Sequence, residues 1–481
     1  MCYINEDILS IIFRKLNNDK ISLYSCLLVN KTWCMTAMPV LWRNPSENID
    51  SSLTARKLLF NVILLHLSEE SRDILKNQGV NKLINEVMNK YQRPLFDYLS
   101  FWKYLDLYFL EIVISSKFDG QLNLPIIRNE ILKLFINENT NLMHLLIPQY
   151  FDYQLHLIPG AEYCLSRLDS LHCHADLDQS ILEGFARICK LIKKLSLVNV
   201  NYCTNNSGII KLIEEQKKLN DVSFDDDGVE HGSFYVRKSF EESLMKHSDF
   251  VQYLRISWIP VTRILSCLVN LISLNIAQIE SNMACWINIE NVTFPLLKIL
   301  KVHQFPSDIL VNLIKNTKGG LSEICICYDG IDSESIFQVI GQSCPNLIYL
   351  ELSLYDNINS FIPVFESLLI NCQFLSGFII DVEDNYFSEF NWCELFIVLA
   401  KSSPINLFKF KFYSKWGFKL EDMELFLKSW EGKNPLLIEM SFCVVRDEDK
   451  FEDLLKYFME KGMIEYYSIG GGRINENFEW I

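Results

Sequence analysis

The sequence predicts an α/β solenoid, a fold in which short parallel strands alternate with helices along one array. Two observations lead to this class. The pattern apolar-x-x-apolar-x-apolar recurs thirteen times, from Leu142/Leu145/Ile147 to Ile464/Tyr467/Ile469. Amphipathic stretches lie between the recurrences, for example Ser307 to Lys315 and Phe361 to Leu369. The last two apolar positions of each pattern point inward from a strand, so each unit is a strand plus a helix. Stacking of neighbouring units then supplies a continuous core.

The composition supports one extended array better than several closed domains. The length of 481 residues alone suggests about three domains. Glycine (18) and proline (13) make up about 6% of the chain, against an average nearer 12%. This excludes collagen, flexible linkers and proline-rich disorder over most of the length. Hydrophobic residues account for 49% and charged residues for 22%, so the whole chain has enough apolar surface to fold.

The first 45 residues predict three short helices. Asn5 is placed to cap the first helix, and Glu6 and Asp7 favour its positive end. A single apolar stripe follows at helical spacing, formed by Ile8, Leu9, Ile12, Phe13 and Leu16. The second helix is expected to begin near Ser22 and the third to contain Trp33. Three short helices make a small core, which usually needs support from a partner or a neighbouring domain.

The order of these residues resembles the F-box motif over roughly residues 3–43. The matching elements are Ile12-Phe13-x-x-Leu16, Asp19-x-x-x-Leu23, Val29-Asn30-x-x-Trp33 and Leu41-Trp42. The motif commonly opens with Leu-Pro, where this chain has Ile4-Asn5. The stretch from Leu28 to Cys34 also looks like the large fungal F-box expansions. The alternative is an ordinary helical hairpin with apolar stripes.

The resemblance implies docking on a Skp-type adaptor, which joins a cullin and its RING partner. It implies that adaptor contact, or the shape of the contact face, depends on Ile8, Leu9, Ile12, Phe13, Leu16, Leu28, Val29 and Trp33. Some of these residues belong to the core, because both roles need apolar side chains. An exposed apolar patch on residues 1–45 would favour this interpretation, whereas a solenoid cap would pack those residues away.

Residues 46–137 predict a helical connector between the N-terminal module and the repeats. Leu58 to Leu67 is apolar enough for a buried helix. Pro94 to Ser115 is rich in aromatic residues, and at helical spacing these indicate packing rather than a stacking platform for bases.

Residues 138–481 predict the solenoid itself, with about 13 irregular repeats. The mean spacing of the pattern is about 27 residues, within the leucine-rich-repeat range of roughly 20–29. Several strands follow Cys, Pro or polar residues, as in Cys344-Pro345-Asn346-Leu347 and Ser403-Pro404-Ile405-Asn406-Leu407. This resembles the cysteine-containing leucine-rich repeats common in F-box proteins. The alternative is a coincidental set of leucine-rich elements in an ordinary α/β domain.

The residues that flank the inward strand positions are expected to line a concave face and to bind a target protein. The candidates are Tyr253, Arg255, Lys301, His303, Tyr349, Glu351, Lys409, Lys411 and Tyr413. Their mixture of charges and aromatic rings is typical of a protein-binding surface. The alternative is a solvated face, with target binding elsewhere.

Charge and hydropathy limit the partners and the compartment. A net charge of −15 argues against nucleic acid, because phosphate binding needs a basic surface. No apolar run reaches about 18 residues without polar interruption, so we expect no membrane span. The first residues lack the basic and apolar regions of a signal peptide. The 15 cysteines are therefore expected to be free thiols in an intracellular reducing compartment, the cytoplasm or the nucleus.

No constellation in the sequence predicts catalysis, a metal or a cofactor. On a strand, His172-Cys173-His174 would direct the thiol inward and both imidazoles outward, so the three cannot easily bind one ion. Cys325-Ile326-Cys327 lacks the two-residue spacer of a redox pair. Asp225-Asp226-Asp227 has no EF-hand spacing, and Gly470-Gly471-Gly472 has no phosphate-loop lysine.

The sequence therefore predicts a non-catalytic substrate-receptor subunit of an SCF-type cullin ubiquitin ligase. Its N-terminal module would dock on the adaptor, and its repeats would hold a target protein near a charged ubiquitin-conjugating enzyme. One alternative is a leucine-rich-repeat interaction scaffold without a ubiquitin role. A further alternative is an enzyme with an unrecognised site.

Overall fold

The computed structural model describes residues 5–48, 52–117, 124–200, 205–225, 234–277, 289, 292–327, 333–354, 358–382, 390–414, 417–442 and 448–470. It divides into two compact units, Met1–Asp227 and Gly228–Ile481. Each unit is described by itself. Some residues named above lie outside the described ranges, namely Ile4, Asp226, Asp227, Gly471 and Gly472.

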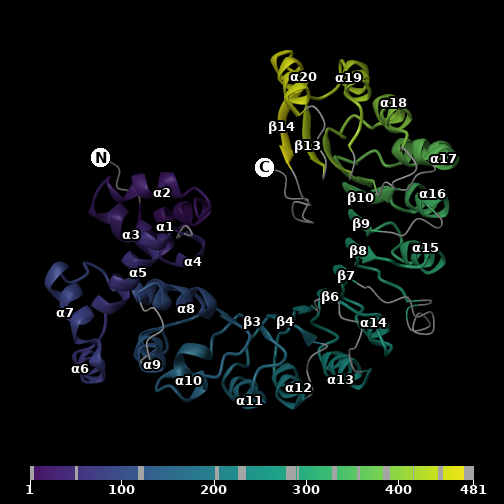
Figure 1. The fold of residues 1–481 in the computed structure, drawn as a ribbon. Coiled ribbons are helices and arrows are strands. Elements are labelled where there is room, and N and C mark those ends of the chain that lie inside the picture. Colours follow the sequence, from purple (N-terminus) through teal and green to yellow (C-terminus); the bar gives the residue numbers. More distant parts are fainter. Residues whose placement is uncertain are drawn as a thin grey trace. The chain divides into compact units, whose positions relative to one another are not determined.

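The first unit begins with helices and continues as alternating strands and helices (Figure 1). Its helical first part comprises α1 (Glu6–Lys15), α2 (Lys20–Leu27), α3 (Lys31–Leu41), α4 (Pro45–Asn48), α5 (Leu53–Leu65), α6 (Glu69–Leu75), η1 (Lys76–Val80), α7 (Asn81–Lys90) and η2 (Tyr98–Phe101). The alternating part comprises β1 (Tyr104–Asp106), α8 (Leu107–Ser115), α9 (Leu124–Phe135), β2 (His144–Ile147), η3 (Leu155–Leu157), α10 (Ala161–Leu165), β3 (Ser170–His174), α11 (Gln179–Ile188), β4 (Lys194–Val198), α12 (Ser207–Glu214) and β5 (Asp221–Phe224).

Strands β2 to β5 each pair in parallel with the strand that precedes them along the chain. Figure 1 shows α11 and α12 together on one side of β3 and β4. The inward positions follow the predicted alternation, because Leu171, Cys173, Leu195 and Leu197 are all fully buried. This parallel strand-and-helix order is that of an α/β solenoid.

The strand array begins earlier than residue 138, inside the segment predicted to be a helical connector. β1 pairs with β2 through Leu105 and Leu145. Trp102, Leu105 and Leu107 are buried and carry the same apolar spacing as the later repeats. The first position of this pattern is an aromatic residue within an aromatic-rich stretch, so the aliphatic pattern of the later repeats does not predict this strand.

At the start of a strand, two successive amides donate to the carbonyl of the residue just before the preceding strand. The carbonyl of Lys103 accepts from the amides of Met143 and His144, both at 2.9 Å. The carbonyl of Arg43, just after α3, accepts in the same way from Lys103 at 2.9 Å and Tyr104 at 3.3 Å. Arg43 thus occupies the place of a preceding repeat, and the N-terminal helices cover the edge at which β1 begins.

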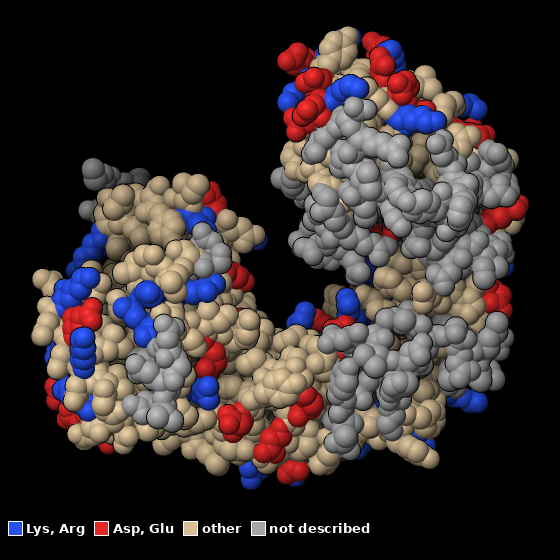
Figure 2. Space-filling view, in the orientation of Figure 1, with Lys and Arg blue, Asp and Glu red and all other residues tan. Residues whose placement is uncertain are grey.

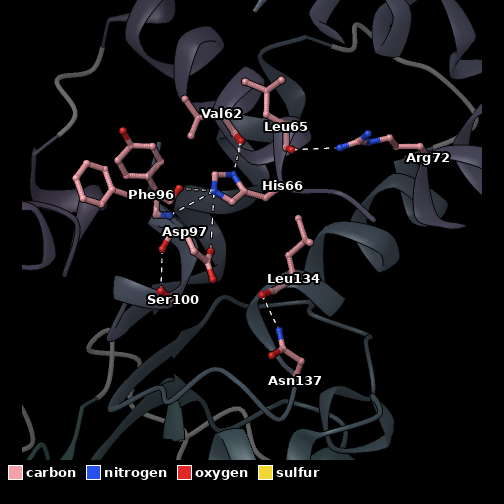
Figure 3. A network of polar contacts seen from close by, with 10 residues as sticks. Val62, Leu65, His66, Arg72, Phe96, Asp97, Ser100, Leu134 and Asn137 are labelled. Carbon is pink, nitrogen blue, oxygen red and sulfur yellow. Dashed lines mark hydrogen bonds and ion pairs between the residues drawn. The ribbon is translucent and has the colours of Figure 1, made fainter. Parts of the chain in front are cut away.

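A second contact fixes the N-terminal helices to the rest of the first unit. The rings of Trp42 and Tyr98 lie 4.4 Å apart. Figure 3 shows how His66, just after α5, holds this segment. Nδ1 of His66 lies 2.8 Å from the Val62 carbonyl oxygen, and Nε2 lies 3.3 Å from both the Tyr98 amide nitrogen and the Phe96 carbonyl oxygen.

The second unit repeats the strand-and-helix order. Its elements are α13 (Phe234–Met245), β6 (Tyr253–Ile256), α14 (Ile264–Cys267), β7 (Ser273–Ala277), β8 (Ile299–His303), α15 (Ser307–Lys315), β9 (Glu323–Cys327), α16 (Ser333–Ser343), β10 (Tyr349–Leu354), α17 (Ile358–Asn371), β11 (Gly377–Val382), α18 (Trp392–Ser402), β12 (Lys409–Ser414), α19 (Leu420–Ser429), β13 (Leu436–Phe442), α20 (Glu448–Glu460) and β14 (Ile464–Gly470).

Strands β6 to β14 also pair in parallel in chain order, and Figure 1 shows α15 to α19 together on the side away from the inner strand face. The apolar pattern predicted for β13 is placed two residues too late in the sequence. Register pairs Phe410 and Phe412 with Ile438 and Met440, so Ile438 and Met440, both buried, are the anchors of β13 that correspond to those of β12. The cause is the extra apolar Leu437, which faces the other side, opposite Lys409.

Aromatic rings fill the core between the strands and helices near the end of the second unit. The ring of Phe396 on α18 lies 5.5 Å from Phe412 on β12 and 5.0 Å from Phe426 on α19. Trp430 lies 5.4 Å from Phe426 and is buried. Such edge-to-face and offset contacts join three successive repeats into one core.

Two further predictions concern membranes and thiols. Among the described helices, none combines the length and the apolar character needed to cross a bilayer. Every cysteine within the described ranges is a free thiol.

Candidate functional site

The three N-terminal helices enclose a small apolar core. It contains Leu9 and Phe13 of α1 together with Leu23, Ala37 and Leu41 from the other two helices. Each helix begins at a capped residue, because Asn5, Asp19 and Asn30 accept hydrogen bonds from the amides of Asp7, Ser22 and Trp33. Phe13 packs edge-on against Trp33, with ring centroids 5.4 Å apart. The helices are therefore ordered by a core of their own.

A set of large apolar side chains on these helices is nevertheless exposed to solvent. We call it the N-terminal apolar surface; it consists of Ile8, Ile11, Ile12, Ile21, Tyr24, Leu28, Val29 and Met35. Leu28 is 88% exposed and Ile21 is 82% exposed. The spacing of Ile21, Tyr24 and Leu28 puts them on one face of α2. Figure 2 shows a largely uncharged area over these helices, at the upper left.

The apolar stripe predicted for the first helix is buried along one edge and exposed along the other. Leu9 and Phe13 are each 1% exposed and belong to the core. Ile8 and Ile12 face solvent with Ile11, one helical turn apart. Helices turn by about 100° per residue, so a run this wide cannot all face one small core.

The predicted adaptor-contact residues therefore fall into three groups. Ile8, Ile12, Leu28 and Val29 lie on the N-terminal apolar surface, Leu9 and Phe13 are core, and Leu16 and Trp33 are half-buried against that core. The sequence interpretation missed the exposed residues Ile11, Ile21, Tyr24 and Met35. Their helical spacing from predicted residues such as Ile8 and Leu28 could have placed them on the same surface.

The inner strand face of the second unit contains all nine predicted target-binding residues, in three states of exposure. Tyr253 and Arg255 are exposed; Lys301, His303, Tyr349, Lys409 and Tyr413 are half-buried; Glu351 and Lys411 are buried. The expectation that Glu351 and Lys411 face open solvent is therefore wrong. The alternation of side chains along a strand predicts on which side of the sheet Glu351 and Lys411 lie, but it does not predict what covers that side.

Charged residues on this face are paired across neighbouring strands. Lys411 Nζ on β12 lies 2.9 Å from a carboxylate oxygen of Glu439 on β13. Lys301 Nζ on β8 lies 3.0 Å from Glu323 on β9. Parallel register brings these residues together, because Lys411 and Glu439 are direct partners. The ion pair with Glu439 offsets the desolvation cost of burying the Lys411 ammonium.

On the same face, a glycine lies between two larger side chains of the neighbouring strands. Tyr349, Gly377 and Lys409 are register partners on β10, β11 and β12. Because Gly377 has no side chain, the Lys409 ammonium reaches across it and lies 5.9 Å from the centre of the Tyr349 ring. This distance is within the range of a cation–π interaction.

Two thiols and a carboxylate meet on β9 and β10. The Cys325 thiol donates a hydrogen bond to Glu351 Oε2 at 3.0 Å. Burial, and then the neighbouring Cys327 thiol, raises the pKa of Glu351 to about 7. The hydrogen bond with Cys327, together with burial, raises the pKa of Cys325 well above its usual value. The spacing of the two cysteines could not predict this cluster, because its carboxylate comes from the neighbouring strand.

The other thiol cluster considered from sequence behaves as predicted. Cys173 is fully buried, whereas His172 and His174 lie on the opposite face. His172 Nδ1 lies 2.9 Å from the hydroxyl of Ser196, and His174 Nδ1 lies 3.2 Å from the amide nitrogen of Asn199. The three side chains do not converge on one point.

Comparisons with known proteins identify no family for this chain. No protein-family model matches the chain, and no curated protein matches it. Among solved structures, it is similar to the leucine-rich repeat-containing protein LegL7 from Legionella pneumophila, at 11% identity. That match covers 63% of this chain and 83% of LegL7, with a TM-score of 0.32. The assignment as a leucine-rich-repeat-like solenoid therefore depends on the strand order and register described above.

Proposed function

We propose that the chain is a substrate-receptor subunit of an SCF-type cullin ubiquitin ligase. Residues 1–45 act as an F-box and dock on a Skp-type adaptor, and the repeats hold a protein target. The chain carries out no bond chemistry. Its contribution is proximity, since it raises the effective concentration of target lysines beside the charged ubiquitin-conjugating enzyme.

The observation that carries this proposal is the N-terminal apolar surface. The eight side chains are exposed although the helices have a core of their own. Complete burial of one such side chain contributes about 1.5–3 kcal/mol, so eight of them favour a protein partner strongly. Contiguous exposed apolar residues on a helical module are typical of an interaction site. A module that served only as a cap would gain nothing by exposing Leu28 and Ile21.

The second candidate is a leucine-rich-repeat scaffold whose N-terminal helices only cap the strand array. The hydrogen bonds from Lys103 and Tyr104 to the Arg43 carbonyl favour it, because they give these helices a capping role. The two functions use different faces. Capping uses the end of α3, whereas adaptor docking uses the exposed faces of α1 and α2.

A pull-down with the full chain separates the two candidates. Immobilised Skp-type adaptor is expected to retain the wild-type chain and to lose Leu28→Asp, because a carboxylate in an apolar interface is left unpaired. Leu95→Asp is the matched control, since Leu95 is 84% exposed but lies outside the N-terminal helices. Retention of both variants at the wild-type level, or no retention of the wild type, would contradict the proposal and favour the scaffold.

A further inference from the structure

The cluster on β9 and β10 has the composition and spacing of a metal site. Cys325 and Cys327 are two residues apart on one strand, so both side chains leave the same face. Register then places Glu351 of β10 directly beside Cys325. One sulfur from each cysteine and one oxygen of Glu351 all lie within 4.8 Å of one another. Cys325 is 1% exposed and Glu351 is 6% exposed, so the groups are held in place by packing.

These distances suit a tetrahedral ion. Zinc binds thiolate sulfur at about 2.3 Å and carboxylate oxygen at about 2.0–2.2 Å, so its ligand atoms lie roughly 3.5–3.8 Å apart. The three atoms of the cluster lie within 4.8 Å of one another, close to that separation. Two thiolates select zinc over magnesium or calcium, which prefer oxygen ligands.

A disulfide explains the cluster less well. Two residues separated by one position on a strand have Cα atoms about 6.6 Å apart, close to the upper limit of about 6.8 Å for a disulfide. A disulfide would also leave the Glu351 carboxylate without the hydrogen bond that Cys325 donates to it at 3.0 Å. A cation uses all three groups at once.

We propose that Cys325, Cys327 and Glu351 bind a zinc-class divalent cation, held by two thiolates from β9 and one carboxylate oxygen from β10. Binding displaces the thiol protons to solvent and replaces the hydrogen bond between Cys325 and Glu351 by two bonds to the ion. His303 of β8 is the register partner of Cys327, but only Cys325, Cys327 and Glu351 converge among the described residues, so water would complete the coordination. The ion links two adjacent repeats and stabilises the second unit. This departs from the sequence-based expectation of no metal.

The test uses the full chain, stripped with a chelator and reloaded with zinc in the presence of a weak competing chelator. Elemental analysis is expected to find about one zinc per chain. Cys325→Ser and Glu351→Gln are expected to weaken zinc binding at least about tenfold, since loss of an outer partner alone costs that much. Cys267→Ser is the control, because it removes an exposed thiol of the same unit. It is expected to leave zinc binding unchanged.

Cobalt substitution gives a second measurement. The wild-type chain and Cys267→Ser are expected to show the thiolate-to-cobalt charge-transfer band, and Cys325→Ser is expected to weaken it. Circular dichroism checks the folding of every variant, and Glu351→Gln decides the question should a cysteine variant misfold. The proposal is overturned if the wild-type chain retains no zinc, or if Glu351→Gln and the cysteine variants retain as much as Cys267→Ser.

Discussion

The N-terminal helices expose isoleucine and leucine, whereas the inner strand face of the second unit buries lysine, glutamate and cysteine. The two regions depart from the usual distribution of side chains in opposite directions. The buried charges have partners within the chain, as in the pair of Lys411 and Glu439. The exposed apolar residues surround a core that is already complete without them. The first region thus leaves apolar side chains open to solvent, whereas the charged groups of the second are largely satisfied by its own residues.

The largest expected effect sharpens the division of the N-terminal helices into buried core residues and exposed apolar residues. Phe13→Ala should lower the free energy of unfolding of the first unit by about 3–5 kcal/mol, because it leaves a cavity beside Trp33. Leu28→Ser should change it by less than about 0.5 kcal/mol, because Leu28 is exposed. Chemical denaturation followed by tryptophan fluorescence measures both. Equal losses from the two substitutions would show that Leu28 is part of the core.

A smaller effect is expected on the inner face of the second unit. Lys411→Met should lower its stability by about 2–3 kcal/mol, because Glu439 is left partly buried without its cation. Lys401→Met is the control. Lys401 also pairs with a glutamate, Glu366 at 3.0 Å, but it is mostly exposed, and its loss should cost less than about 1 kcal/mol. Thermal unfolding by circular dichroism compares the two, and similar midpoints would contradict the buried pair.

The smallest effect concerns pH in chelator-treated protein. The pKa of Glu351 is about 7 in the folded chain, against an ordinary value of 4.5. The folded state therefore holds this proton more tightly than the unfolded state. Stability should be greatest below about pH 4.5 for this group and fall as pH rises toward 7. Glu351→Gln should flatten that part of the pH profile of the unfolding midpoint, and an unchanged slope would contradict the assignment.

The strand and helix order could be predicted from the sequence, because apolar spacing directly reflects which side of an element is buried. Leu171 and Cys173, chosen as inward positions, are fully buried. Three features could not be predicted in this way. The apolar pattern around β1 begins with Trp102 in place of an aliphatic residue, Leu437 shifts the pattern on β13, and Lys411 is buried on the face expected to be open. Spacing assigns a residue to a side, but neighbouring elements decide what that side contacts.

The central claim is that the N-terminal apolar surface binds an adaptor, and calorimetry of the full chain with a purified Skp-type adaptor tests it most directly. The account predicts one-to-one binding with a negative heat-capacity change, the mark of apolar burial. It also predicts that Leu28→Asp abolishes the binding heat while Leu95→Asp preserves it. Absence of binding by the wild-type chain, or equal binding by Leu28→Asp, would contradict the claim.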